Sequence, residues 1–349
     1  MDDHHPNETA GPSRMRTDET KTGDRVVASV LCGSTDSLSV EEMSASRDSQ
    51  PALDKAFFPL SSSKTFADPS TCGAENTLQR PAHSKLLLEP PIRDIWEQLA
   101  VDIVDKKAWK VDSFDSLTSL DAYSEDVRHF PAEDERIRMK KRRDAALRLR
   151  SSPERWSRLA LDALRELATD SSGPAVATLV ESGLLAVFKD FAVHTRYFQV
   201  TKKLMESAGI TVFVAGHASS STHDIDKLDP IMLAGYTDRW EDTKRTALWY
   251  LCVHSHYSLN THHQQHELWH AEDSDDKERE RCKALPELLC DKASRKLQKE
   301  LNGVVSPDMW SVEAKFYLGM PEVWLDRVTR MARQLAERTP SGESNVTVT

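Results

Sequence analysis

Hydrophobic residues recur at steps of three and four through most of the chain after its first 85 residues. The clearest case lies within residues 90–110, where Trp96, Leu99 and Ile103 follow two prolines, a pattern typical of an amphipathic helix that begins behind proline. Similar spacing predicts further helices in 132–170 (broken near Pro153), 172–209 (two helices), 242–257, 285–301 and 306–338 (a final pair). Strand-like and helical segments do not alternate, and we therefore expect an all-α fold.

Two stretches depart from the helical spacing. Residues 112–131 read as a loop or a series of short turns. The β-branched run "ITVFVAG", residues 210–216, fits either a strand or a buried segment, and periodicity alone does not separate the two.

The first 85 residues are poor in large apolar side chains. Their only aromatic residues are three phenylalanines, whereas all eight tryptophans and all six tyrosines come later. So little apolar surface cannot offset the entropy of ordering the backbone, about 1–2 kcal/mol per residue. We therefore predict a disordered tail over 1–85, a helical extension over 86–180, a helical domain over 181–335 and a second disordered tail over 336–349.

Charge and cysteine content narrow the classes of function. The formal charge of −10 argues against a nucleic-acid partner, because proteins that neutralise phosphates usually carry a basic surplus. No apolar run is long enough for a membrane span and no signal peptide is recognisable, so we expect no membrane partner. The five cysteines form no Cys-x-x-Cys pair and fit reduced thiols in the cytoplasm.

One basic cluster allows another location. Lys140, Lys141, Arg142 and Arg143 could act in nuclear import or bind a phosphate. Acidic residues precede the cluster on the same predicted helix, and a charge run on a helix usually only solvates it. We therefore interpret it first as a solvated helix face.

Histidines concentrate near the end of the chain. Six of the thirteen lie in "HSHYSLNTHHQQHELWH", residues 254–270. Imidazole is both a common metal ligand and an ordinary surface group. On a helix, His262, His266 and His270 would share one face while His263 and Glu267 share another. We favour His262 and His263, the pair beside Asn260, as ligands and interpret His254, His266 and His270 as surface residues.

The sequence "HDIDK", residues 223–227, supplies a second candidate. A neighbouring His223 and Asp224 on a helix would point about 100° apart, so other helices would have to complete a metal site. His194 upstream and Asp291 downstream are the candidates for that task. The alternative is that His223 and Asp224 only open a helix, because "STHD" contains good N-capping residues.

In this order the residues resemble the HD superfamily of metal-dependent phosphohydrolases, with "HDIDK" close to its HD-x-G-K variant. More narrowly they resemble an HD-like family whose members form a domain of unknown function. The likeness covers roughly residues 181–320, and Asp226 stands where the variant motif has glycine. The matching positions are His194, His223, Asp224, Lys227, His256, Asn260, His262, His263, Glu267, Trp269, Glu287 and Asp291.

The resemblance implies a function and a role for each residue. His194, His223, Asp224 and Asp291 would hold one divalent ion (Mn, Fe, Zn or Mg), and His256 with His262 or His263 would be available for a second. Lys227 would neutralise a phosphate, and Glu267 would orient a histidine or act as a base. The reaction would be hydrolysis of a nucleotide or another small phosphorylated substrate, with water activated by the metal.

A different class of function remains open. The missing glycine at Asp226 and the extra helical surface before residue 180 also fit a catalytically silent interaction module. In that case a protein partner would bind through residues 1–180.

Overall fold

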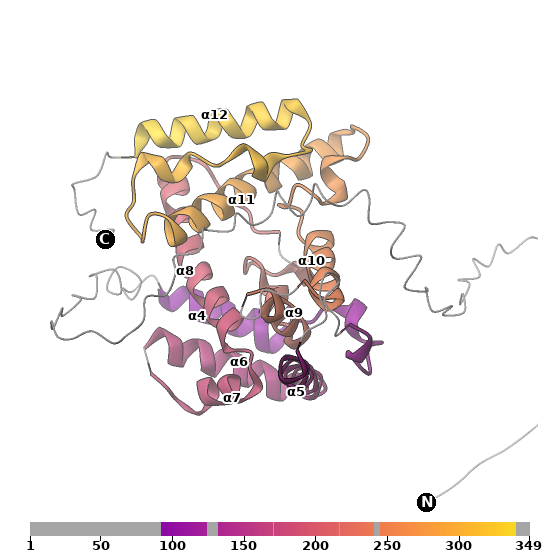
Figure 1. The fold of residues 1–349 in the computed structure, drawn as a ribbon. Helices are drawn as coiled ribbons and strands as arrows, with labels where there is room; N and C mark the ends of the chain where they lie inside the picture. Colours follow the sequence, from indigo (N-terminus) through magenta and orange to yellow (C-terminus); the bar gives the residue numbers. More distant parts are fainter. Residues whose placement is uncertain (1–91, 124–131, 170, 216, 241–244, 340–349) are drawn as a thin grey trace, which may run out of the picture. The chain divides into compact units, whose positions relative to one another are not determined.

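The computed structural model describes residues 92–123, 132–169, 171–215, 217–240 and 245–339, with side chains from Trp96 onward. Within these ranges no β-strand forms, which confirms the all-α prediction (Figure 1). The predicted N-terminal tail lies outside the described residues. The helices are α4 (Ile92–Ala100), α5 (Glu133–Arg150), α6 (Pro153–Ala168), α7 (Pro174–Ser182), α8 (Leu185–Ser207), α9 (Pro230–Trp240), α10 (Ala247–Leu259), α11 (Asp275–Lys299) and α12 (Glu322–Arg338).

Shorter helical turns join them. The π-helical turn η2 (Val101–Asp105) continues α4, and 3-10 turns follow at η3 (Asp112–Phe114), η4 (Asp121–Tyr123), η5 (His217–Ser219), η6 (Ile225–Leu228), η7 (Glu267–Trp269), η8 (Pro307–Trp310) and η9 (Ala314–Tyr317). Residues 112–123 therefore form the short turns expected there. The run 211–215 is an irregular segment with Val212 buried and Phe213 exposed, so the strand alternative is wrong.

Proline and glycine set several helix ends. Pro153 and Pro174 begin α6 and α7, where the missing N–H costs no hydrogen bond. Gly183 ends α7 in the left-handed conformation, with φ of 68°. These ends agree with the breaks expected from the sequence.

Helix α11 begins ten positions earlier than the predicted 285, at Asp275. Ser274 caps it by accepting a hydrogen bond from the Lys277 backbone N–H, and Asp275 and Asp276 lie in the first turn, where the helix dipole favours negative charge. The charged residues before position 285 therefore belong to the helix. At the other end of the chain, α12 continues to Arg338, so the first residues of the predicted tail are helical.

Two hydrophobic cores hold the helices. The first core joins α4, η2, α6, α7, the first half of α8, η6, α9 and α10. Inside it, Trp156 packs edge to face against Trp109 and against Phe188, with ring centroids 6.4 Å apart in both pairs. Its larger members are Leu99, Ile103, Trp109, Phe114, Trp156, Leu164, Leu179, Phe188, Phe191, Ile225, Leu228, Ile231, Leu233, Leu248 and Trp249.

The second core joins the later half of α8 to α11, η8 and α12. Helices α11 and α12 lie side by side (Figure 1). Trp269 and Trp324 pack edge to face in this core, as expected of core tryptophans. Its larger members are Phe198, Met205, Leu268, Trp269, Leu285, Leu288, Leu289, Leu297, Met309, Trp310, Tyr317, Trp324 and Val328.

Helix α8 belongs to both cores. Phe191 lies in the first and Phe198 in the second, and His194 lies between them on the helix. The first core also contains residues on both sides of the predicted boundary at 180/181. That boundary stays a prediction, but the hydrophobic packing does not follow it.

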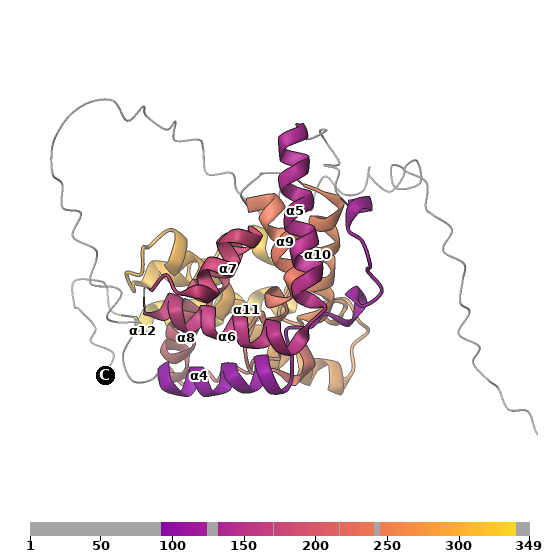
Figure 2. The same cartoon turned by 90° about the horizontal axis from the view of Figure 1, so that it is seen from below.

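The basic cluster on α5 is only partly solvated. Arg142 and Arg143 are each 2% exposed, and both donate to the buried carboxylate of Asp238 on α9, at 2.9 and 2.6 Å. Figure 2 shows α5 lying along α9. The two arginines are buried, so the interpretation of the cluster as a solvated helix face is wrong for them. Their buried charges need a partner such as the Asp238 carboxylate. A receptor for nuclear import could not reach them in the folded chain.

Among the described helices, none combines the length and the apolar character needed to cross a membrane.

Candidate metal centre

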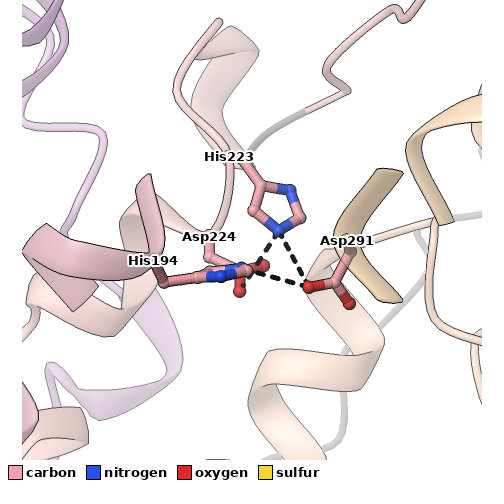
Figure 3. A group of neighbouring side chains, drawn as sticks. All are labelled: His194, His223, Asp224 and Asp291. Atoms are coloured by element: carbon pink, nitrogen blue, oxygen red, sulfur yellow. Dashed lines mark ion pairs between the residues drawn. The ribbon is translucent and has the colours of Figure 1, made fainter. Parts of the chain in front are cut away.

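Four side chains from three parts of the fold converge in the interior (Figure 3). His194 comes from α8, Asp291 from α11, and His223 with Asp224 from the turn before η6. Each offers one ligand atom, and these atoms all lie within 4.8 Å of one another. The four residues predicted for the first ion are therefore brought together, and they could hold a metal.

The shortest contacts run between imidazole nitrogens and carboxylate oxygens. His194 Nε2 lies 3.1 Å from Asp291 Oδ1. His223 Nε2 lies 3.4 Å from Asp224 Oδ2 and 3.5 Å from Asp291 Oδ1. The imidazole nitrogens and the carboxylate oxygens thus face one common point (Figure 3).

The pair His223-Asp224 does not lie on an α-helix as expected. Asp224 has φ of 56° and ψ of 27°, the left-handed conformation, and only then does the 3-10 turn η6 begin. Aspartate is one of the few residues that adopt this conformation at modest cost. With this bend, both side chains face the same point.

A second group forms on the other side of Asp224. Its Oδ1 atom lies 3.4 Å from His262 Nε2 and 3.6 Å from His256 Nε2, and His263 Nε2 lies 2.8 Å from His256 Nε2. Asp224, His256 and His263 also have ligand atoms within 4.8 Å of one another. The two oxygens of one carboxylate thus face two groups of histidines.

The histidine stretch is not helical from Asn260 to His266. Residues 261–266 form turns, so the expected division into two helical faces is wrong. In a turn, neighbouring side chains can point the same way, and His262 and His263 are both buried at the centre. His254 and His270 are exposed, while His266 accepts a hydrogen bond from the Leu268 backbone N–H.

Two buried carboxylates orient the histidines from behind. Glu287 accepts from His223 Nδ1 at 2.9 Å and from the backbone N–H of Ala215 at 3.0 Å. Asp226 lies 2.7 Å from His256 Nδ1 and also accepts from the Asn260 side chain. Carboxylates in this position fix the ring and direct its other nitrogen forward.

Sequence reasoning gave neither carboxylate a role. Glu287 lies one helical turn before Asp291 and is among the positions that match the HD-like family, but no role was inferred for it. Asp226 had been considered only as a replacement for glycine. Glu267, which was assigned this orienting role, is exposed at the start of η7 and is not brought to the centre.

Two lysines flank the centre. Lys227 Nζ lies 2.6 Å from Asp224 Oδ2, and Lys292 Nζ lies 2.5 Å from Asp291 Oδ2. Their side chains are 14% and 12% exposed, whereas those of Asp224 and Asp291 are 1% and 5% exposed. An ammonium group that is more exposed than its partner therefore lies against each of the two carboxylates.

The surroundings shift the pKa of each central group. Burial, with Arg295 nearby, lowers the pKa of His194 to about 3, so this imidazole is neutral. Burial opposes protonation of His223 as well, but the nearby carboxylates of Asp224, Asp291 and Glu287 outweigh it and raise the pKa to about 9. The pKa of Asp224 is held well below its usual value, because His223 and Lys227 outweigh the effect of burial.

Several buried polar atoms at the centre have no hydrogen-bond partner among the described residues. They include both ring nitrogens of His194, Nε2 of His223, both ring nitrogens of His262, Nδ1 of His263 and Oδ1 of Asp224. An unpaired buried polar atom costs about 1–3 kcal/mol. A cation would use these lone pairs, displacing the proton from His223, so the donors present fit a divalent metal.

Comparison with protein-family models, with curated proteins and with solved structures gives no match for this chain. The interpretation of the centre therefore stands on its geometry and chemistry.

Proposed function

We propose that this protein is a divalent-metal-dependent phosphohydrolase of the HD type. The observation that carries the proposal is the convergence of His194, His223, Asp224 and Asp291, buried and with unused lone pairs. Mixed imidazole and carboxylate ligands suit Mn²⁺, Fe²⁺ or Zn²⁺ better than Mg²⁺, which prefers oxygen. The group of Asp224, His256 and His263 provides for a second ion.

The ammonium groups of Lys227 and Lys292 support a phosphoester as substrate. Both lie at the more exposed edge of the centre, where a phosphoryl group would enter. A bound divalent ion would lower the pKa of water towards 7 and stabilise charge on a phosphoryl oxygen. The two lysines would hold the other phosphate oxygens, while Glu287 and Asp226 keep the imidazoles in place.

The first experiment is elemental analysis of full-length protein purified without a histidine tag or chelator. We expect near-stoichiometric metal, and its loss in the double variant His223→Ala, Asp224→Ala. His254→Ala is the matched control, because His254 belongs to the same histidine stretch but is exposed. The proposal would be contradicted if the double variant held as much metal as the parent protein. It would also be contradicted if the parent, the double variant and the control all lacked metal after reconstitution.

Phosphoester screening follows on the metal-loaded protein. Lys227→Met and Lys292→Met should each lower kcat/KM about tenfold or more, since a charge-assisted hydrogen bond contributes about 1.5–3 kcal/mol. Metal content should stay unchanged in both variants. No hydrolysis of any phosphoester by the metal-loaded protein would reduce the proposal to metal binding alone.

The alternative of a silent interaction module loses part of its basis. It rested on Asp226 in place of glycine, and this carboxylate is now seen beside His256 Nδ1. Its other basis, the helical surface before residue 180, contributes to the first core.

A further inference from the structure

A buried carboxylate outside the candidate centre binds the segment that leads into it. Asp102, on η2, is fully buried, and its Oδ2 atom accepts from Ser220 Oγ and Thr222 Oγ1, each at 2.8 Å. Ser221 Oγ lies 3.4 Å from the same oxygen. Three consecutive hydroxyl groups directly before His223 thus converge on one oxygen atom.

The segment held in this way has an unusual backbone. Ala218, Ser219 and Asp224 all have positive φ, of 54°, 58° and 56°. Side-chain-bearing residues adopt this conformation only where the surroundings impose it. The imposed shape is what turns His223 and Asp224 towards His194 and Asp291.

Further contacts reach the same segment from the residues around Asp102. Lys106 Nζ donates to the backbone oxygen of Ser219 at 3.1 Å and lies 3.1 Å from Asp102 Oδ1. His217 Nε2 lies 2.8 Å from the backbone oxygen of Lys110. The segment before the ligands is therefore fixed by η2 and the loop that follows it.

The far end of the turn is fixed as well. Asp229 accepts from the backbone N–H of Val111 at 3.0 Å and from Arg150 Nε at 2.9 Å. Trp156 Nε1 donates to the backbone oxygen of Leu228 at 3.0 Å. Both ends of the ligand turn are thus held by residues that precede the predicted domain boundary.

We infer that Asp102 is a positioning residue of the candidate metal centre and acts through the hydroxyl groups of Ser220 and Thr222. It is not a ligand, because it belongs to none of the groups of converging ligand atoms found in the described part of the chain. Its carboxylate holds the left-handed turn in the one shape that aims His223 Nε2 and Asp224 at a common point. The inference rests on the proposed metal function.

The test uses cobalt(II) as the probe, with full-length protein stripped of metal. We expect Asp102→Ala to weaken cobalt binding about 10–100-fold, the usual effect of removing a group that supports a metal ligand. The visible absorption spectrum of the bound cobalt should change too, because the ligands are differently placed. Thr222→Val should cause a smaller loss of the same kind, and Thr222→Ser, which keeps the hydroxyl, should restore parental binding.

Asp238→Asn is the matched control, since Asp238 is an equally buried carboxylate whose partners Arg142 and Arg143 lie outside the centre. It should lower the Tm without changing cobalt affinity or spectrum. If Asp102→Ala does not fold, the cobalt affinity and the absorption spectrum of Thr222→Val test the inference instead.

The inference would be overturned if Asp102→Ala bound cobalt with the affinity and the spectrum of the parent protein. If Asp102→Ala does not fold, the same result in Thr222→Val would overturn it. Either result would leave the proposed metal function intact. Equal weakening by Asp238→Asn would also overturn the inference. Absence of cobalt binding in the parent protein would instead remove the proposed function, and this inference with it.

Discussion

Ala218 carries a side chain in a conformation that suits glycine, with φ of 54°. The left-handed region costs a residue with a Cβ atom about 1–2 kcal/mol, whereas glycine pays about 0.5–1 kcal/mol in chain entropy. Ala218→Gly should therefore raise the free energy of unfolding by about 0.5–1 kcal/mol. Urea denaturation measures the change.

The same substitution elsewhere provides the control. Ala177 is exposed within α7, where glycine should lower the free energy of unfolding by about 1 kcal/mol. Opposite signs at Ala218 and Ala177 are the expected pattern. A loss at Ala218 as large as at Ala177 would show that the positive φ there carries no strain.

Glu287 and Glu267 offer a second contrast between single residues. Glu287→Gln replaces the carboxylate that holds His223 Nδ1 and should weaken metal binding about 10–100-fold. Glu267→Gln should have no such effect, because Glu267 is exposed. Calorimetric titration with Mn²⁺ compares the two variants, and equal affinities would refute the role given to Glu287.

At this scale the sequence indicated candidate ligands better than their supports. The pair His223-Asp224 is visible as a motif, and it does meet His194 and Asp291 in the fold. Glu287 matches the family pattern without an inferred role, and Asp226 and Asp102 are ordinary acidic residues in the sequence. Burial with a donor at hydrogen-bond distance shows what the three carboxylates do. The partners of Asp226 and Asp102 depend on the tertiary fold and leave no local pattern.

Helices α8 and α11 run antiparallel and are joined by polar contacts on successive turns. Asp291 faces His194, and one turn away Arg295 Nη1 lies 2.6 Å from Asp190 Oδ2 while Lys299 Nζ lies 2.8 Å from Asp190 Oδ1. Burial alone would raise the pKa of Asp190, but Arg295 and Lys299 outweigh it and lower the pKa well below its ordinary value. The pair of helices that carries two ligands is thus tied together beside them.

This ion pair predicts a dependence of stability on pH. Because the pKa of Asp190 is lower in the folded than in the unfolded chain, its stabilisation is complete above about pH 5 and declines as the pH falls further. Asp190→Asn should lower the free energy of unfolding by about 2 kcal/mol at pH 7. The difference from the parent should shrink at pH 3.5, and urea titrations at both values test it; an equal difference at both would contradict it.

Among the elements, regular helices were predictable and the ligand-bearing turns were not. Amphipathic spacing with proline and glycine at the ends located α4, α6, α7 and α8. The turns at 217–228 and 261–266 were wrongly expected to be helical or left unassigned, because their shape comes from distant partners such as Asp102. The start of α11 was missed because charged residues conceal a helix that is capped by Ser274.

On the scale of the whole molecule, the residues before position 180 belong to the same hydrophobic core as the ligand turn. Ile225 and Leu228 pack in the first core with Trp156 and Phe188. A fragment limited to residues 181–335 would expose much of that core to water, at about 25 cal/mol for each Å² of apolar surface. It would also lack Asp102, Arg150 and Trp156.

We therefore expect the fragment 181–335 to show no cooperative thermal unfolding and no metal binding. Circular dichroism during heating and elemental analysis, each beside the full-length chain, provide the measurements. A fragment that unfolds cooperatively and retains metal would mean that the helical extension is a separable partner module.

The ligands of the candidate centre and the residues that hold them in place come from distant parts of the chain. His223 and Glu287 are 64 positions apart, and Thr222 and Asp102 are 120 positions apart. Closing such long loops has to precede any shared contact with an ion, because the entropy of closure is lost first. A metal held here would consequently join the molecule late in folding. Bound metal would therefore increase kinetic stability: it would slow unfolding and leave the rate of folding almost unchanged.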